Sequence, residues 1–133
     1  MESQERTIGS LDLDNGLTVY FIDRSGPPVA GRCQVQLLIW VPVEPAEDHF
    51  CNYPEPSKAL SRFISLAGLD PVGFRVVKAR SFIGLNDVGA ALEEMKNDFI
   101  ASGLEYLKRP GFAAKFIVRK YEELCQKAAV RRY

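Results

Sequence analysis

An Asn-Gly pair at positions 15 and 16 separates two alternating apolar runs, and this pattern constrains the fold more than any other feature of the chain. Asn-Gly between alternating apolar residues is the strongest short-range signal for a β-hairpin, because both residues tolerate positive φ. We therefore expect strands at 8–13 and 17–23, joined by a type I′ turn. The fold then begins with an antiparallel pair of strands.

A third strand is predicted over residues 33–41, where side chains alternate strictly between two faces. One face is uniformly apolar and is expected to lie in the core: Val35, Leu37, Ile39 and Val41. The other face changes from polar to apolar along the strand: Gln34, Gln36, Leu38 and Trp40. Pro42 has no amide hydrogen and is expected to end the pairing.

The rest of the chain predicts three helices and one more strand. Ser57 is expected to cap a helix that Gly68 closes in the left-handed conformation. A fourth strand is predicted at 74–83, followed by helices at 88–107 and at 113–129. The longer helix carries a regular apolar stripe: Val88, Leu92, Met95, Phe99 and Tyr106.

The element order β-β-β-α-β-α-α is typical of an α+β fold. We expect a mostly antiparallel sheet of about four strands with the helices packed on one face. The chain of 133 residues is predicted to form a single domain.

Composition narrows the class of protein. The chain is 47% apolar and 26% charged, as soluble globular proteins are, and contains no apolar run of about 20 residues that would cross a bilayer. Three cysteines do not form a disulfide framework and indicate a reducing compartment. The acidic, polar start is unlike a secretory signal. We expect a cytoplasmic protein that is not associated with a membrane.

Charge is distributed unevenly although the net charge is zero. Residues 1–56 have nine acids and three bases, whereas residues 57–133 have fourteen bases and eight acids. The two halves are expected to face each other within the fold, or the basic half offers a surface to an acidic partner. A pI near 6.6 argues against general nucleic-acid binding.

The fourth strand is a candidate ligand-binding surface because it carries Arg75, Lys78 and Arg80. Lys78 and Arg80 share one face with three apolar residues: Phe74, Val76 and Phe82. Bases interleaved with aromatic rings bind nucleotides or single-stranded nucleic acid in other proteins. The alternative is that the long side chains cover apolar surface while their charged ends reach water.

An aromatic patch is predicted on the sheet face opposite the most regular apolar stripe. It consists of four residues: Tyr20, Ile22, Leu38 and Trp40. If the helices cover only one side of the sheet, this patch is exposed and marks a protein interface, often that of a homodimer. The alternative is that the first helix or the preceding loop covers it.

The acidic loop around the single histidine is a candidate metal site, with Glu47, Asp48, His49 and Cys51 in close succession. Such side chains ligate zinc, but a structural site needs about four of them and no second Cys/His pair is present. One histidine also leaves only one general base for nucleophilic catalysis. We therefore expect a solvated loop, no cofactor and no catalytic set.

Five segments of the chain form a set when taken together: 13–18, 23–25, 29–32, 104–112 and 116–123. This set resembles a family of small bacterial proteins with no known activity. This resemblance implies a bacterial, intracellular protein of one domain and brings no catalytic residues or cofactor.

Three hypotheses for function follow. The first is a non-enzymatic module that binds a protein partner or itself through the aromatic patch. The second is a binder of nucleotides or single-stranded nucleic acid that uses the basic strand. The third is a metal-dependent enzyme at the acidic loop.

Overall fold

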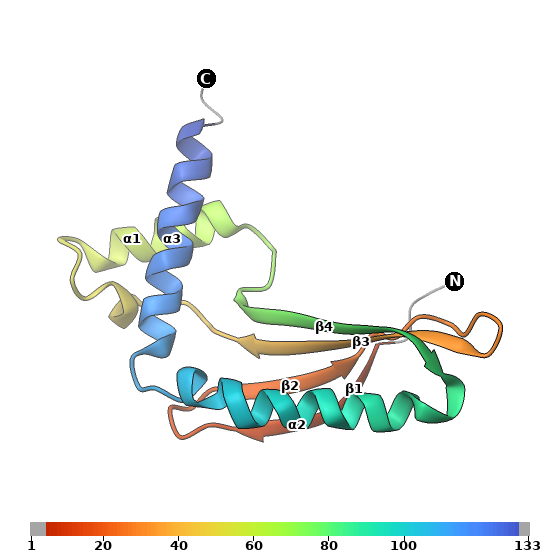
Figure 1. Cartoon of the computed structure of the whole chain (residues 1–133). Helices are drawn as coiled ribbons and strands as arrows, with labels where there is room; N and C mark the ends of the chain where they lie inside the picture. Colours follow the sequence, from red (N-terminus) through yellow and green to blue (C-terminus); the bar gives the residue numbers. More distant parts are fainter. Residues whose placement is uncertain (1–4, 131–133) are drawn as a thin grey trace. The chain divides into compact units, whose positions relative to one another are not determined.

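The structure, a computed structural model, describes residues 5–130 and confirms an α+β fold with the predicted order of elements (Figure 1). The elements are, in chain order, β1 (Arg6–Asp12), β2 (Thr18–Asp23), β3 (Arg32–Pro42), the 3₁₀-helix η1 (Glu47–Phe50), α1 (Pro56–Ala67), β4 (Gly73–Gly84), the 3₁₀-helix η2 (Leu85–Asp87), α2 (Val88–Leu107) and α3 (Phe112–Val130). The helix predicted at 88–107 begins and ends at the predicted residues, and the strands differ from prediction by one or two residues at most ends.

The chain divides into two compact units. One, called here the sheet unit, comprises residues up to 41 together with 75–108, and the other, the helical unit, comprises 42–74 together with residues from 109 onward. The chain therefore passes between the units three times, and neither unit is one continuous segment. The single domain expected from length remains a prediction.

The sheet is antiparallel, with its strands in the order β1-β2-β3-β4. The register of β2 and β3 places Tyr20 opposite Trp40 and Ile22 opposite Leu38. β1 pairs with the other side of β2, and its register shifts by one residue between Thr7 and Gly9. β1 and β4 are thus the two edges of the sheet, and β3 ends at Pro42 as predicted.

The hairpin between β1 and β2 forms as predicted, but the type I′ turn is wrong. Only Gly16 has a positive φ, of 90°, whereas Asn15 does not. The Gly16 N–H donates to the Leu13 carbonyl at 3.0 Å, and the Leu13 N–H donates to the Leu17 carbonyl at 2.8 Å. This is a three-residue loop in which a tight turn is followed by a glycine of positive φ, the next most common hairpin geometry.

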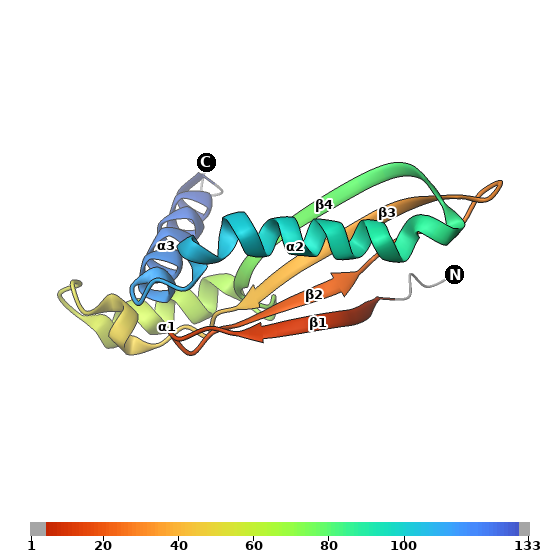
Figure 2. The same cartoon turned by 60° about the horizontal axis from the view of Figure 1, so that its bottom comes forward.

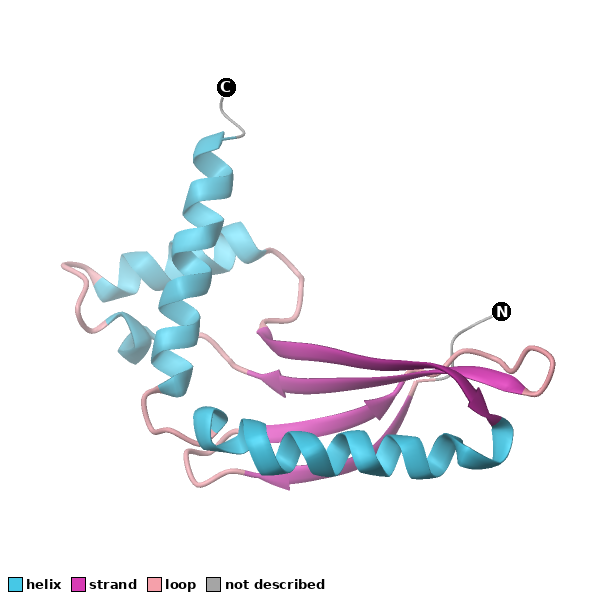
Figure 3. Cartoon of the chain, in the orientation of Figure 1, coloured by secondary structure: helices cyan, strands magenta, loops and turns pink. Residues whose placement is uncertain are grey.

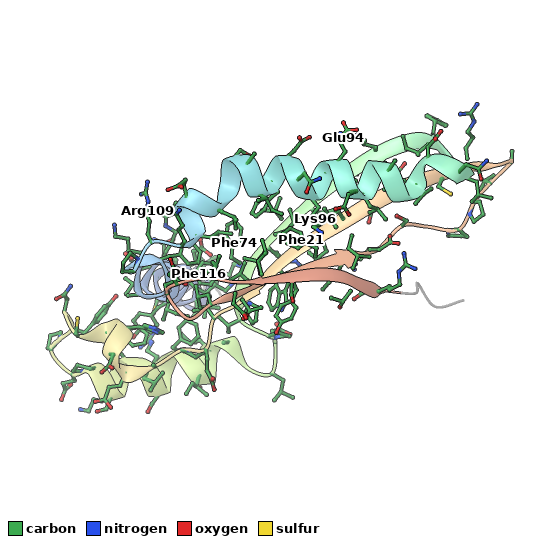
Figure 4. All side chains as sticks on the ribbon, turned by 90° about the horizontal axis from the view of Figure 1, so that it is seen from below. Phe21, Phe74, Glu94, Lys96, Arg109 and Phe116 are labelled. Atoms are coloured by element: carbon green, nitrogen blue, oxygen red, sulfur yellow. The ribbon has the colours of Figure 1, made fainter. Side chains whose placement is uncertain are left out.

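One face of the sheet, called here the inner face, packs against α2 (Figure 2). Its central side chains are fully buried: Val19, Phe21, Val35, Leu37, Ile39 and Val41. Phe21 contacts Phe99 of α2 edge to face, with ring centroids 6.3 Å apart. The Lys96 Nζ lies 5.9 Å from the centre of the Phe21 ring, and Figure 4 shows both side chains between helix and sheet. The predicted apolar face is therefore the core of this unit.

The apolar stripe of α2 differs from prediction at its C-terminal end. Leu92, Met95 and Phe99 are buried as expected, but Tyr106 is about half exposed and Leu107 is buried instead. The Asn15 side-chain amide donates to the Leu107 carbonyl at 2.7 Å, which ties the hairpin loop to the last turn of α2. Leu107 therefore lies where the helix meets the hairpin.

The helical unit contains η1, α1 and α3, which pack against one another (Figure 3). The predicted cap at Ser57 is wrong: the residue before the helix is Glu55, and Pro56 occupies the first turn, where its missing N–H costs nothing. Gly68 follows α1 with the positive φ predicted for it, 67°, but its ψ of −138° lies outside the left-handed helical region.

We predict that Gly16→Val destabilises the protein by about 1–3 kcal/mol, because a β-branched residue is strained at a φ of 90°. Chemical denaturation measures the effect. Gly26→Val is the matched control, since a Cβ at Gly26 meets nothing within 4 Å and its φ is not in the left-handed region. Equal losses in the two variants would contradict this account of the turn.

The two glycines of α2 are predicted to respond oppositely to alanine. A Cβ at Gly103 would lie 2.6 Å from the Phe99 ring, which is held against Phe21, whereas a Cβ at Gly89 meets nothing within 4 Å. Gly89→Ala is expected to stabilise by up to about 1 kcal/mol through helix propensity alone. Gly103→Ala is expected to destabilise the protein, because the Phe99 ring must move and this costs more than the gain in helix propensity. Thermal unfolding of both variants tests this.

Candidate functional site

The sheet face opposite α2, called here the outer face, carries the predicted aromatic patch. Because strand side chains alternate, burial of Val19 and Phe21 against α2 turns Tyr20 and Ile22 to the outer face. The register then places Trp40 beside Tyr20 and Leu38 beside Ile22. We call these four residues the outer patch. The structure therefore brings all four predicted interface residues together on adjacent strands.

Exposure across the outer patch is graded. Along β3, Gln34 is exposed, Gln36 is half-buried, Leu38 is buried at 6% exposure and Trp40 is half-buried. Tyr20 and Ile22 are also half-buried. Exposure therefore decreases from Gln34 to Leu38, where the residues change from polar to apolar, and is higher again at Trp40. Large rings and branched chains in directly opposite pairs also stabilise the sheet.

β4 extends the outer face. The Ser81 hydroxyl donates to the Gln34 side-chain carbonyl at 2.7 Å, which places Ser81 on the same face as Gln34. By alternation Val77 lies on this face too, with 49% of its surface exposed. Polar side chains therefore border an apolar centre, as at many protein interfaces.

Both edges of the sheet carry features that oppose pairing with another strand. β1 contains the register shift between Thr7 and Gly9, and β4 carries the charged residues predicted as a ligand surface. The regular conformation of β4 also breaks at Phe82, whose φ is 60° and whose side chain is 81% exposed. Bulges and charges are the usual protection of sheet edges. Both edges of the sheet are therefore protected against pairing with another strand.

The three bases of the basic strand do not share one face, because alternation along β4 places Lys78 on the side of Arg80 and Arg75 on the opposite face. Arg80 lies on the side of α2, where its guanidinium group is 3.0 Å from the Glu94 carboxylate and 4.0 Å from that of Asp98. Lys78 is half-buried, and Arg75 is exposed. In Figure 4 the labelled Glu94 lies on the outside of α2, away from Lys96 and Phe21. Arg80 is therefore charge-compensated, and ligand binding by this strand remains a prediction.

The acidic loop includes η1, and its residues Glu47, Asp48 and Cys51 are exposed, as expected of a solvated loop, whereas Phe50 is buried. The ring nitrogen Nδ1 of His49 accepts a hydrogen bond from the Ala46 N–H at 3.1 Å. Cys51 is exposed, and its sulfur lies 3.9 Å from the Asn52 side-chain oxygen. Within residues 5–130, no group of three or more His, Cys, Asp or Glu side chains is arranged to hold a metal ion.

Sequence reasoning missed an aromatic cluster in the helical unit. Phe50 lies at its centre, with the ring centroids of Tyr53, Phe63 and Tyr121 at 5.5, 6.2 and 5.3 Å. Burial raises the pKa of Tyr121, as does its hydrogen bond with Cys125. Burial also raises the pKa of Tyr53. The four rings come from η1, the segment that follows it, α1 and α3, so no local pattern in the sequence could reveal the cluster.

A second aromatic contact in this unit lies at the start of β4. Phe74 meets Phe112 edge to face, with ring centroids 5.8 Å apart, and Phe112 stacks on Phe116 at 6.0 Å. Phe74 was predicted to share a strand face with Lys78 and Arg80. Its ring contacts the first turn of α3.

Comparison with known protein families, with curated proteins and with solved structures finds no match. The resemblance to small bacterial proteins therefore stays a prediction. In the described part of the chain, no helix combines the length and apolar character that a membrane span requires.

We predict that stability falls as the pH drops through the range in which His49 titrates. Burial lowers the pKa of His49 below 6.5, and the Asp48 carboxylate opposes this shift only in part. A lowered pKa means that the folded state binds the proton less readily than the unfolded state, so the contribution is complete above about pH 6.5 and is lost below the folded-state pKa.

Unfolding by urea at several pH values measures this contribution, and ¹H NMR of the single imidazole gives its pKa directly. His49→Gln serves as the comparison, because its free energy of unfolding is expected to change less between pH 7 and pH 5. A His49 pKa above 6.5 would contradict the prediction.

Proposed function

We propose that this protein is an interaction module that associates with a second copy of itself through the outer patch of its sheet. The observation that carries the proposal is the pairing of Tyr20 with Trp40 and of Ile22 with Leu38 on the face that α2 does not cover. Aromatic and large apolar side chains at the centre of a surface are what protein interfaces enrich.

The distribution of polar groups supports a face-to-face contact. The outer patch itself contains no charged residue, and Arg75, which alternation places on the same face of β4, is exposed and can stay hydrated at the border of a contact. Gln34, Ser81 and the hydrogen-bonded pair of Thr18 and Asp12 lie around it and can stay hydrated at a rim. This arrangement of an apolar centre and a polar border is that of an interface core and rim.

A second copy is the favoured partner for two reasons. The net charge of the chain is zero, so two copies do not repel each other as whole molecules. A contact around a twofold axis would also pair the outer patch with itself, which satisfies both surfaces at once. Two antiparallel sheets packed in this way are separated by about 10 Å.

Sedimentation velocity across a concentration series, from about 1 μM to about 1 mM, tests self-association in the range of weak complexes. We expect the weight-average sedimentation coefficient to rise from the monomer to the dimer value. Trp40 lies in the outer patch, so its fluorescence emission is expected to shift to the blue over the same range. A monomer at every concentration, with constant Trp40 emission, would refute the proposal.

Ile22→Lys is the variant that tests the surface. Burying an unpaired ammonium group at the interface is expected to weaken the dimer at least about tenfold. Leu69→Lys is the matched control, because it adds the same charge at a fully exposed leucine outside the sheet. Circular dichroism establishes that each variant is folded. A folded Ile22→Lys protein that dimerises like the control would show that the contact lies elsewhere.

A further inference from the structure

A cleft of about 310 Å³ lies within the helical unit, between the end of α1, the segment that follows it and one side of α3. Its apolar lining is aliphatic and includes Leu66, Val72 and Leu124. Three ionisable residues also line it: Asp70, Lys120 and Lys127. Its volume is at the lower end of the range for small-molecule sites. No hypothesis drawn from the sequence uses it.

The two lysines stand in helical register with the apolar lining. Lys120, Leu124 and Lys127 are spaced four and three residues apart, so they lie on the same side of α3. None of the three ionisable residues of the lining forms an ion pair within 4.0 Å with another described residue. The cleft therefore combines an aliphatic lining with a formal net charge of +1 and two lysines that form no ion pair within the described part of the chain.

The geometry points to a small aliphatic monocarboxylate as the ligand of this cleft. The apolar tail would contact Leu66, Val72 and Leu124, and the carboxylate would lie between the two ammonium groups. A charge of −1 matches the net +1 of the lining residues. The carbonyl end of α1, which stops at Ala67 beside the cleft, offsets part of the positive charge of the lysines, so the lining would neutralise one negative charge on a ligand better than two.

Isothermal titration of the full chain with octanoate, octanol and octyl phosphate tests this inference. We expect saturable binding of octanoate in preference to both the uncharged alcohol and the more highly charged phosphate. Equal binding of octanol would show that the lysines do not recognise charge, and tighter binding of octyl phosphate would refute the preference for a monocarboxylate. Failure to detect saturable octanoate binding at about 10 mM, a concentration that reveals even weak complexes, would overturn the proposal outright.

Variants of the two lysines locate the site. Lys120→Ala and Lys127→Ala are each expected to weaken octanoate binding about tenfold, the effect of losing one charge-assisted hydrogen bond. Lys115→Ala is the matched control, because Lys115 is an exposed lysine of α3 outside the lining. Chemical-shift changes at Leu66 and Val72 on addition of octanoate would confirm the tail position. If Lys120→Ala and Lys127→Ala reduce the affinity for octanoate no more than Lys115→Ala does, the proposed role of the two lysines is refuted.

Discussion

Packing of α2 against the inner face of β2 and β3 determines the position of every other surface in the sheet unit. Phe21 contacts Phe99 through its ring, and Lys96 lies close to the same ring. Because strand side chains alternate, the position of Phe21 on the inner face places Tyr20 and Ile22 on the outer face. The outer patch is thus a geometric consequence of the core, and a shift of register by one residue would bury it and expose the core residues instead.

The elements that the sequence predicted well are those specified by periodicity. Strict alternation in β3 and the regular apolar stripe of α2 each identify an element without reference to the rest of the chain. The turn was predicted less well because Asn15 acts in two ways. Its side-chain oxygen accepts from the Leu17 N–H, and its amide donates to the carbonyl of Leu107, 92 residues away. Sequence rules for turns consider only neighbouring residues, so they do not include the hydrogen bond from Asn15 to Leu107.

The candidate sites also divide into features that local periodicity specifies and features that tertiary contacts specify. Alternation sufficed to assemble the outer patch, whereas the ion pair of Arg80 with Glu94 depends on how a strand and a helix meet. The cluster around Phe50 includes Tyr121, 71 residues further along the chain, and it buries Phe50 within a loop whose acidic residues stay exposed as expected. Contacts of this kind depend on tertiary structure. Sequence reasoning therefore predicted which side chains face outward better than which charges are compensated.

The two units alternate along the chain, and this order determines when each element meets its packing partners during synthesis. A ribosome completes β1, β2 and β3 first, but the strand and helix that finish the sheet unit emerge only after residues 42–74. Until α2 has been synthesised, Phe21 and Ile39 of the nascent sheet have no helix to pack against. In the same way, α1 has no packing partner until α3 has been synthesised. During that interval the growing polypeptide presents apolar strands, the kind of transient surface that promotes aggregation and makes chaperones necessary.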